Sequence, residues 1–203
     1  MNRACKVQTA SNTYDRLREA ALELFSTHGY QSTSLRDLAR HLGVQAGSIY
    51  NHVESKQSLL FELMEETLDD LMEETRQNLS GAGTTQSRLK AFIQAYVAFQ
   101  SRGRRRLELI ERELVNLTDE QREHIVQMRA RYRQNLIAII GKELAGARVS
   151  SSSLQMLGYA VLGMMHGLPT STEAPSQAVV DQLSSMISGA IAATKQQPII
   201  SSI

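Results

Sequence analysis

Residues 20–60 read AALELFSTHGYQSTSLRDLARHLGVQAGSIYNHVESKQSLL, and the spacing of their apolar residues decides the fold. Apolar residues recur three or four positions apart up to His28, and Gly29 follows where a left-handed residue ends a helix. A second short apolar face begins after the capping residues Thr33 and Ser34 and ends at Gly43. A third begins almost at once, near residue 46. The stretch predicts three helices, with a tight turn between the last two.

The same periodicity extends outward from this stretch. Ser55 can cap a fourth helix, whose apolar stripe ends near residue 79. The segment SGAGTTQS, residues 80–87, is typical of a joint between two parts of a chain. Beyond it, the pattern predicts helices near 86–101, 104–116, 119–144, 152–168 and 176–193. Because all 3 prolines lie after residue 168, none interrupts the earlier helices, and we expect an all-α protein.

This pattern divides the chain into two predicted domains. Residues 12–58 form the first domain, and the fourth helix, residues 55–79, connects it to a second domain over residues 80–195. We expect the residues before the first domain, which include Cys5, and the last residues KQQPIISSI to be tails.

Composition excludes several classes of protein. The 22 basic and 21 acidic residues give a net charge of +1, so any attraction to nucleic acid must be local. One cysteine permits no internal disulfide, and no group of Cys and His has the spacing of a zinc site, so we expect no metal and no cofactor. No apolar run is long enough to span a bilayer, and the first residues lack the apolar core of a signal peptide. We therefore expect a cytoplasmic protein without a membrane partner.

Two short helices joined by a turn that contains glycine are typical of the helix-turn-helix motif, which places its second helix in the major groove of DNA. The polar residues of this stretch can meet base edges or phosphates, and Asp37 is the only acidic residue between Ser32 and Val53. The alternative is that the basic residues, Arg36, Arg40 and Lys56, only solvate helix surfaces.

The stretch from Ala20 to Leu60 closely resembles the DNA-binding domain of the TetR family of transcriptional repressors. The matching residues are Leu24, Phe25, Gly29, Tyr30, Thr33, Ser34, Asp37, Leu38, Ala39, Gly43, Val44, Gly47, Ser48, Ile49, Tyr50, His52, Ser55, Lys56 and Leu59. Many members carry Phe where this chain has Val53 and an acidic residue where it has Gln57, and Asn51 leaves the operator sequence open.

The resemblance implies a role for each residue of the motif. Thr33 and Ser34 lie at a helix N-terminus, which favours a phosphate, although simple capping explains them equally well. A side chain such as that of Arg36 can pair with guanine, while Lys56 anchors a phosphate. The remaining DNA-binding positions lie on or next to the recognition helix: Gln45, Ala46, Gly47, Ser48, Tyr50, Asn51 and His52. Ser48 and Asn51 are the residues expected to read bases.

The resemblance also implies that the second domain binds a small effector and forms a homodimer through the helices near 152–168 and 176–193. Such a dimer binds double-stranded operator DNA with palindromic symmetry as a repressor. Four glycines, Gly158, Gly163, Gly167 and Gly189, allow close approach of helices there, although the same apolar faces also suit a monomeric core.

Candidate effector-pocket residues are apolar or aromatic, and each is also explained as plain core: Phe92, Ile93, Tyr96, Phe99, Ile110, Leu114, Met128, Tyr132, Met156 and His166. Some family members with a similar Glu, Asn, Arg, Tyr spacing sense acyl-coenzyme A thioesters. The corresponding residues here are Glu111, Glu113, Asn116, Arg129, Tyr132 and Arg133, close to the basic run Arg102, Arg104, Arg105 and Arg106. The expected effector is therefore small and largely apolar, with an acyl-CoA or a fatty acid as candidates.

Two other classes of protein explain less of the sequence. An enzyme lacks support because the sequence has no glycine-rich phosphate loop, no HExxH and no GxSxG motif. A helical interaction protein that does not bind DNA explains the helices, but it does not explain the joint presence of Arg36, Ser48, Tyr50, His52 and Lys56.

Overall fold

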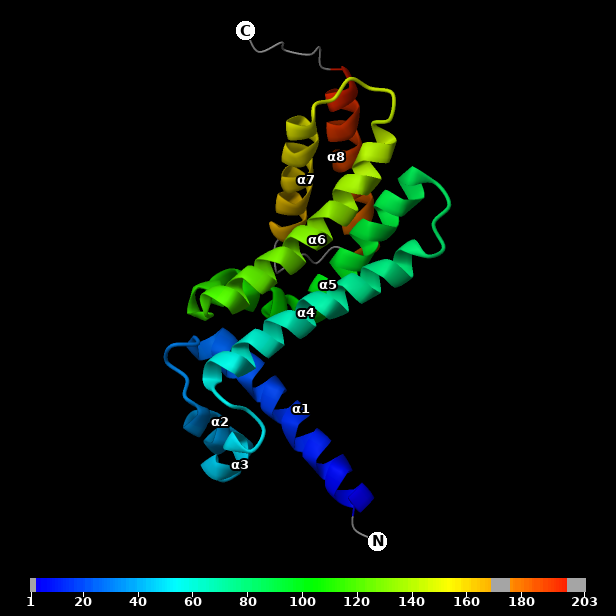
Figure 1. Cartoon of the computed structure of the whole chain (residues 1–203). Coiled ribbons are helices and arrows are strands. Elements are labelled where there is room, and N and C mark those ends of the chain that lie inside the picture. The colour runs from blue at the N-terminus through cyan, green and yellow to red at the C-terminus, as the bar shows by residue number, and fades with distance from the viewer. Residues whose placement is uncertain (1–2, 169–175, 197–203) are drawn as a thin grey trace. The chain divides into compact units, whose positions relative to one another are not determined.

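A computed structural model describes residues 3–168 and 176–196, and every regular element in these two ranges is a helix (Figure 1). In chain order the elements are α1 (Arg3–His28), α2 (Leu35–Leu42), α3 (Ala46–Tyr50), α4 (Lys56–Leu79), α5 (Thr85–Glu113), a single 3₁₀ turn η1 (Leu114–Asn116), α6 (Asp119–Glu143), α7 (Ser151–His166) and α8 (Ser176–Gln196). This arrangement confirms the all-α prediction. None of the described helices combines the length and apolar character needed to cross a bilayer.

The chain forms two compact units. Unit 1 comprises Met1–Leu68 and Gly103–Val126, and unit 2 comprises Asp69–Arg102 and Gln127–Ile203. The helices α4, α5 and α6 each contribute residues to both units.

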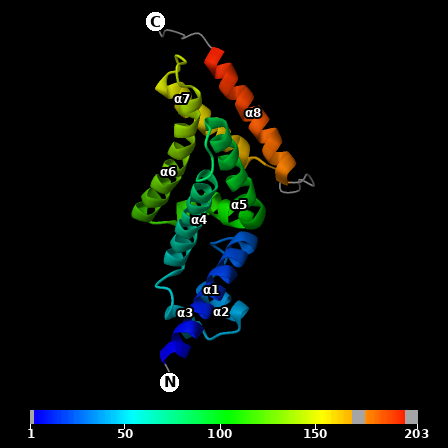
Figure 2. The ribbon, with the colours of Figure 1, turned by 90° about the vertical axis from the view of Figure 1, so that its right-hand side faces the viewer.

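In unit 1, α1, α2 and α3 gather around a small apolar core (Figure 2). The side chains of Leu17, Phe25, Leu38 and Ile49 are all 0% exposed. Phe25 packs edge-on against Tyr30, with ring centroids 5.2 Å apart. These contacts bury the apolar faces that the sequence predicts for the first three helices.

Local signals fix where these helices begin and end. The Ser34 hydroxyl accepts a hydrogen bond from the Asp37 backbone N–H, and the Asp37 carboxylate accepts one from the Ser34 backbone N–H, which is a capping box at the start of α2. Gly29 and Gly43 adopt φ angles of 87° and 69°, the left-handed conformation in which glycine ends a helix without strain. Both predicted helix ends are confirmed.

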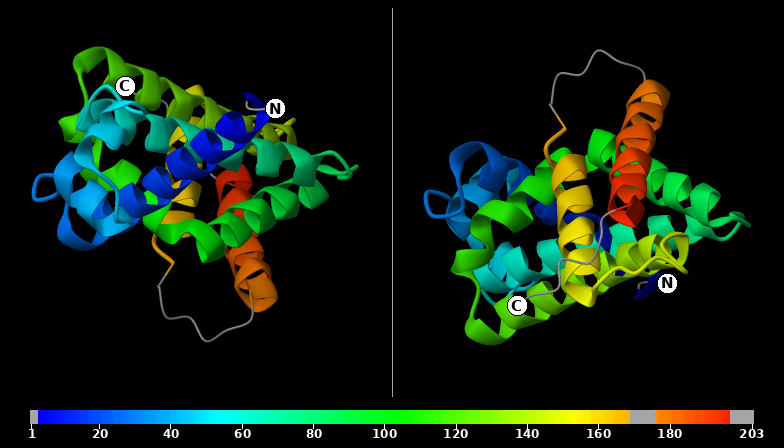
Figure 3. Two further views of the ribbon diagram at one scale, coloured as in Figure 1. Left: turned by 90° about the horizontal axis from the view of Figure 1, so that it is seen from below. Right: turned by 90° about the horizontal axis from the view of Figure 1, so that it is seen from above.

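Unit 2 is built around the fully buried side chains of Phe92, Leu136 and Val161. The helices α7 and α8 lie side by side (Figure 3). A Cβ atom at Gly158 would stand 2.5 Å from Cγ1 of Ile137, so this glycine lets α7 approach α6 closely. The close helix approach expected at Gly158 therefore occurs within the chain, between α7 and α6.

Both predicted tails differ in part from the structure. Residues 3–11 belong to α1, because neither proline nor glycine interrupts the residues before Gly29. Of the predicted tail KQQPIISSI, Lys195 and Gln196 continue α8, while residues 197–203 lie outside the described residues, as do residues 169–175 between the last two predicted helices.

The predicted boundary between helices 86–101 and 104–116 corresponds to a kink in α5 at Gly103, where φ is −132° and ψ is 31°. The 3₁₀ turn η1 follows α5.

Candidate functional site

The shortest of the described α-helices, α3, has one buried residue and an exposed face. Ile49 is 0% exposed, whereas Gln45, Gly47, Tyr50 and Asn51 are exposed. Within the described residues, the side chains of Gln45 and Asn51 have no hydrogen-bond partner. This face offers free donors and acceptors of the kind that read base edges in the major groove.

The other predicted DNA-binding residues differ in how far they are exposed. Arg36 is exposed on α2, and its guanidinium has no ion-pair partner in the described part of the chain. Ala46, Ser48 and His52 are half-buried, and the His52 ring lies 6.2 Å from the Tyr14 ring of α1.

Thr33 and Ser34 are committed to the protein itself. Thr33 is 3% exposed, and its hydroxyl donates to the Gly29 carbonyl at 2.9 Å. The Ser34 hydroxyl belongs to the capping box, whose hydrogen bonds lower the pKa of Asp37 below its usual value. Ser34 thus has the capping role that the sequence offered as the alternative to a phosphate contact, and the Thr33 hydroxyl bonds within the turn after α1. Phosphate contact by either residue stays a prediction.

Lys56 ties the start of α4 to the turn between α1 and α2. Its Nζ donates to the carbonyl oxygens of Tyr30 and Thr33, both at 2.9 Å, and lies 4.1 Å from the centre of the Tyr30 ring. Partial burial lowers the pKa of Lys56, and the nearby Glu113 carboxylate opposes that shift. An ammonium group has three donors, so one remains for a phosphate.

We expect the substitution Lys56→Met to lower the free energy of unfolding by about 1–3 kcal/mol, because it removes two charge-assisted hydrogen bonds while keeping the apolar stem. Urea denaturation measures the change. Lys90→Met is the matched control, since Lys90 makes only a surface ion pair with Asp181. If Lys56→Met changed the salt dependence of DNA binding and left stability intact, its role would be that of a phosphate contact alone.

A polar cluster next to the hydrogen bonds of Lys56 was not predicted from the sequence. The Asn116 side chain accepts a hydrogen bond from the Gln31 amide and donates to Glu113 at 2.8 Å. Its backbone carbonyl accepts from the Gln57 amide at 2.6 Å. The spacing of Glu113 and Asn116 suggested effector chemistry, but both belong to unit 1, whereas Arg129 and Tyr132 belong to unit 2. No local pattern signals this cluster, because its members are up to 85 residues apart.

The predicted pocket residues belong to both units. Six of them are buried side chains of unit 2: Phe92, Ile93, Tyr96, Phe99, Met128 and Tyr132. Ile110 and Leu114 belong to unit 1, and Met156 is 69% exposed on α7. The Tyr96 hydroxyl bonds to Nδ1 of the exposed His166 at 2.7 Å. Aromatic packing joins Phe92 to Tyr132, with ring centroids 4.9 Å apart, and burial raises the pKa of Tyr132.

Three of the four arginines of the basic run contact neighbouring groups of the same chain. Arg102 pairs with Glu74 at 2.5 Å, Arg104 pairs with Glu108 at 2.6 Å, and Arg106 donates to the Thr67 hydroxyl at 3.2 Å.

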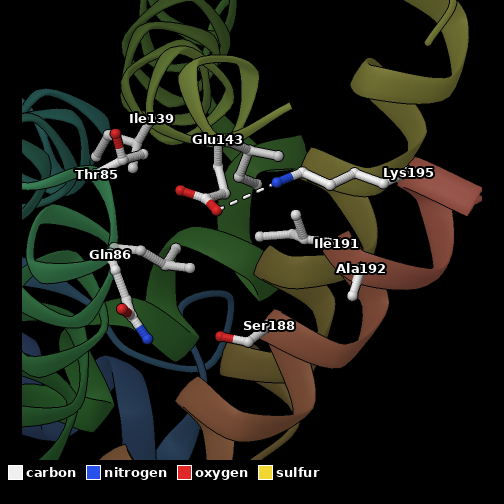
Figure 4. A pocket seen from close by; sticks show the side chains of 10 residues that line it. Thr85, Gln86, Ile139, Glu143, Ser188, Ile191, Ala192 and Lys195 are labelled. Atoms are coloured by element: carbon white, nitrogen blue, oxygen red, sulfur yellow. Dashed lines mark hydrogen bonds and ion pairs between the residues drawn. The ribbon is translucent and has the colours of Figure 1, made fainter. Parts of the chain in front are cut away.

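A cavity of about 190 Å³ lies elsewhere in unit 2, between the start of α5 and the ends of α6 and α8 (Figure 4). Its lining shares no residue with the predicted pocket: Thr85, Gln86, Leu89, Ile139, Ile140, Glu143, Ser188, Ile191, Ala192 and Lys195. Among the described residues, no group of three or more Cys, His, Asp and Glu side chains could hold a metal ion.

Comparison with known proteins matches two parts of the chain to models of one protein family. Residues 17–63 match the family described as "Bacterial regulatory proteins, tetR family", and residues 82–170 match "Tetracyclin repressor-like, C-terminal domain". The chain is similar to the HTH-type transcriptional repressor KstR2 of Rhodococcus jostii, with 32% identity over 77 residues, or 38% of each chain. The chain thus matches about two fifths of the length of this curated relative.

Two solved structures show the same fold. A bacterial regulatory protein of the tetR family from Rhodococcus RHA1 superposes with a TM-score of 0.77 at 22% identity, covering 89% of this chain and 96% of that one. AibR, in complex with isovaleryl coenzyme A and operator DNA, superposes with a TM-score of 0.73 at 21% identity, covering 85% and 96%.

Proposed function

We propose a repressor function on the premise that this chain belongs to the TetR family and is a non-enzymatic, DNA-binding transcriptional regulator. In this proposal the protein binds a palindromic operator as a homodimer, and a small, largely apolar effector releases it. The proposed domains are residues 12–58 for DNA binding, α4 as the connector and residues 80–195 for effector binding and dimerisation.

The observation that carries the DNA-binding role is the outward face of α3. One buried side chain, Ile49, fixes the helix, while Gln45, Tyr50 and Asn51 remain free for another molecule. Arg36 adds an exposed guanidinium on α2, which suits a guanine or a phosphate.

The outward faces of α7 and α8 support the homodimer. Met156, Tyr159 and Met186 are large apolar or aromatic side chains that are 53–69% exposed. A Cβ atom at Gly163 or Gly189 would meet no atom within 4 Å, so both glycines face open space. Large exposed apolar residues beside small ones suit close packing against a second copy.

Val180 lies in the second of the two helices predicted to form the dimer, but it does not belong to this outward surface. It is 3% exposed in the single chain, and Leu183 and Ile187 of the same helix face are buried with it. These side chains form the core of unit 2.

The effector proposal rests on the family and on AibR, which was solved with isovaleryl coenzyme A. An acyl-CoA or a fatty acid is the proposed effector class. A ligand releases DNA only if it binds the non-binding arrangement of the dimer more tightly. Linkage then requires operator DNA to weaken effector binding by the same factor.

Selection of bound duplexes from a random pool tests the proposal. We expect the full-length protein to enrich an inverted repeat whose half-sites are about 34–36 Å apart, one turn of DNA. Placing that repeat before a reporter gene should lower expression when the protein is present. An enriched site without two-fold symmetry would contradict the dimeric mode of binding, and raised expression would contradict the repressor role.

Replacing Ser48 or Asn51 with alanine should weaken binding to the selected operator by about 1–3 kcal/mol per half-site while leaving binding to random duplex DNA nearly unchanged. The reason is that base contacts carry the discrimination between sequences. Fluorescence anisotropy with both duplexes at one salt concentration measures the two affinities. Equal losses on both duplexes would assign these residues to the DNA backbone.

A further inference from the structure

The cavity between the start of α5 and the ends of α6 and α8 has an apolar floor and a polar rim. Its floor is formed by Leu89, Ile139, Ile140 and Ile191, all at most 5% exposed. These branched side chains present only apolar atoms, so they favour an aliphatic group over a polar one.

The rim holds one charge of each sign. Nζ of Lys195 lies 3.3 Å from Oε1 of Glu143, and both side chains are 39% exposed. Figure 4 shows this pair reaching in from α6 and α8, with the Gln86 amide and the Ser188 hydroxyl around the same space. All of these residues belong to unit 2.

The size of the cavity limits what it can take. A cavity of about 150 Å³ holds benzene, which has six non-hydrogen atoms. In the same proportion, a cavity of about 190 Å³ holds a ligand with roughly eight such atoms. A whole acyl-CoA is larger than this cavity, whereas a short aliphatic chain fits its floor.

The ion pair favours a ligand that carries both charges. A ligand with a single charge would contact one partner of the Glu143–Lys195 pair and leave the other partner, which is 39% exposed, to water. A ligand with both charges can place its ammonium group on Glu143 and its carboxylate on Lys195, so that both partners keep a counter-ion. The Gln86 amide and the Ser188 hydroxyl line the same cavity.

We infer that this cavity binds a small aliphatic amino acid as its zwitterion, with the side chain on the apolar floor and the two charged groups at the rim. As a regulatory site, the cavity rests on the proposed repressor function. Its binding chemistry does not, because it can be measured without DNA.

Isothermal titration of the full-length protein with L-leucine tests the inference. The two matched probes are 4-methylpentanoate, which lacks the ammonium group, and isoamylamine, which lacks the carboxylate. We expect L-leucine to bind at least about tenfold more tightly than either probe, since each probe loses one charge-assisted contact. Equal binding of L-leucine and 4-methylpentanoate would overturn the zwitterion assignment, and absence of binding by L-leucine would overturn the site.

Substitutions at the cavity test whether L-leucine binds there. Ala192→Phe fills the cavity and should abolish binding of L-leucine, whereas Ala138→Phe places the same ring on an exposed position of α6 and should leave it unchanged. The double variant E143K/K195E keeps one charge of each sign at the rim and should retain binding, while K195Q alone should weaken it by about tenfold. Unchanged binding by Ala192→Phe, with its circular dichroism also unchanged, would place the ligand elsewhere.

These titrations also separate the inference from the proposed function. If L-leucine does not bind but the protein still selects a palindromic operator, only the ligand inference fails. If L-leucine binds but no operator is selected, the proposed function fails and the site remains.

Discussion

Replacing Gly163 with glutamate is expected to produce a monomer whose affinity for operator DNA is lower by roughly 10²–10⁴-fold. Gly163 lies on the exposed face of α7 and has open space around it, so the chain itself can accept a longer side chain. Two copies that pack through this face would instead bury a pair of like charges, which is strongly unfavourable. A monomer reaches only one half-site and loses the gain from linking two recognition helices. Sedimentation measures the oligomeric state, and anisotropy measures the affinity.

Two further variants show whether this effect arises at an interface. Ala138→Glu puts the same charge on an exposed position of α6 and should leave both the dimer and its affinity intact. Val180→Asp should unfold unit 2, because Val180 is 3% exposed in the single chain and the new carboxylate would be buried without a partner. A Gly163→Glu protein that remains dimeric would place the interface outside this face.

Replacing Ile49 with alanine should remove specific DNA binding altogether by releasing α3. Ile49 is the one buried residue of this five-residue helix, and its side chain is 0% exposed. Loss of a fully buried isoleucine costs about 2–5 kcal/mol. A helix this short has no stability of its own. We therefore expect the free energy of unfolding of unit 1 to fall by that amount and the protection of α3 amides from hydrogen exchange to disappear.

Tyr50→Ala is the matched control, since the neighbouring side chain is 56% exposed. It should change the free energy of unfolding by less than about 0.5 kcal/mol, as surface substitutions usually do. If the Ile49→Ala protein kept both its operator affinity and the protection of its α3 amides, contacts other than the Ile49 side chain would position α3.

Local signals were sufficient to predict three helix ends in the N-terminal part of the chain. Glycine at positions 29 and 43 and the Ser34–Asp37 capping box depend on a few neighbouring residues, so the sequence alone predicts where α1 ends and where α2 begins and ends. The family pattern over residues 20–60 added the DNA-binding role, and the exposed face of α3 agrees with it.

The contacts of Lys56 and Asn116 could not be predicted in this way. Lys56 bonds to carbonyl oxygens 23 and 26 residues away, and Asn116 bonds to Gln31 and Gln57. A sequence pattern indicates that a side chain is polar, but not which distant group will lie within 3 Å of it. The cavity was missed for the same reason, since its lining comes from three helices spread over residues 85–195.

Periodicity and capping act between residues at most a few positions apart, so they predicted most of the helices, the ends of α2 and the apolar character of α7 and α8. Which face of α7 and α8 is core and which is open follows only from the folded chain. Both faces carry apolar and small residues, so their composition alone does not distinguish them. The contact of Gly158 with Ile137 and the burial of Val180 turn one face inward, which leaves Gly163 and Met186 on the other. That choice depends on how side chains of separate helices fit together, and periodicity along one helix carries no information about that fit.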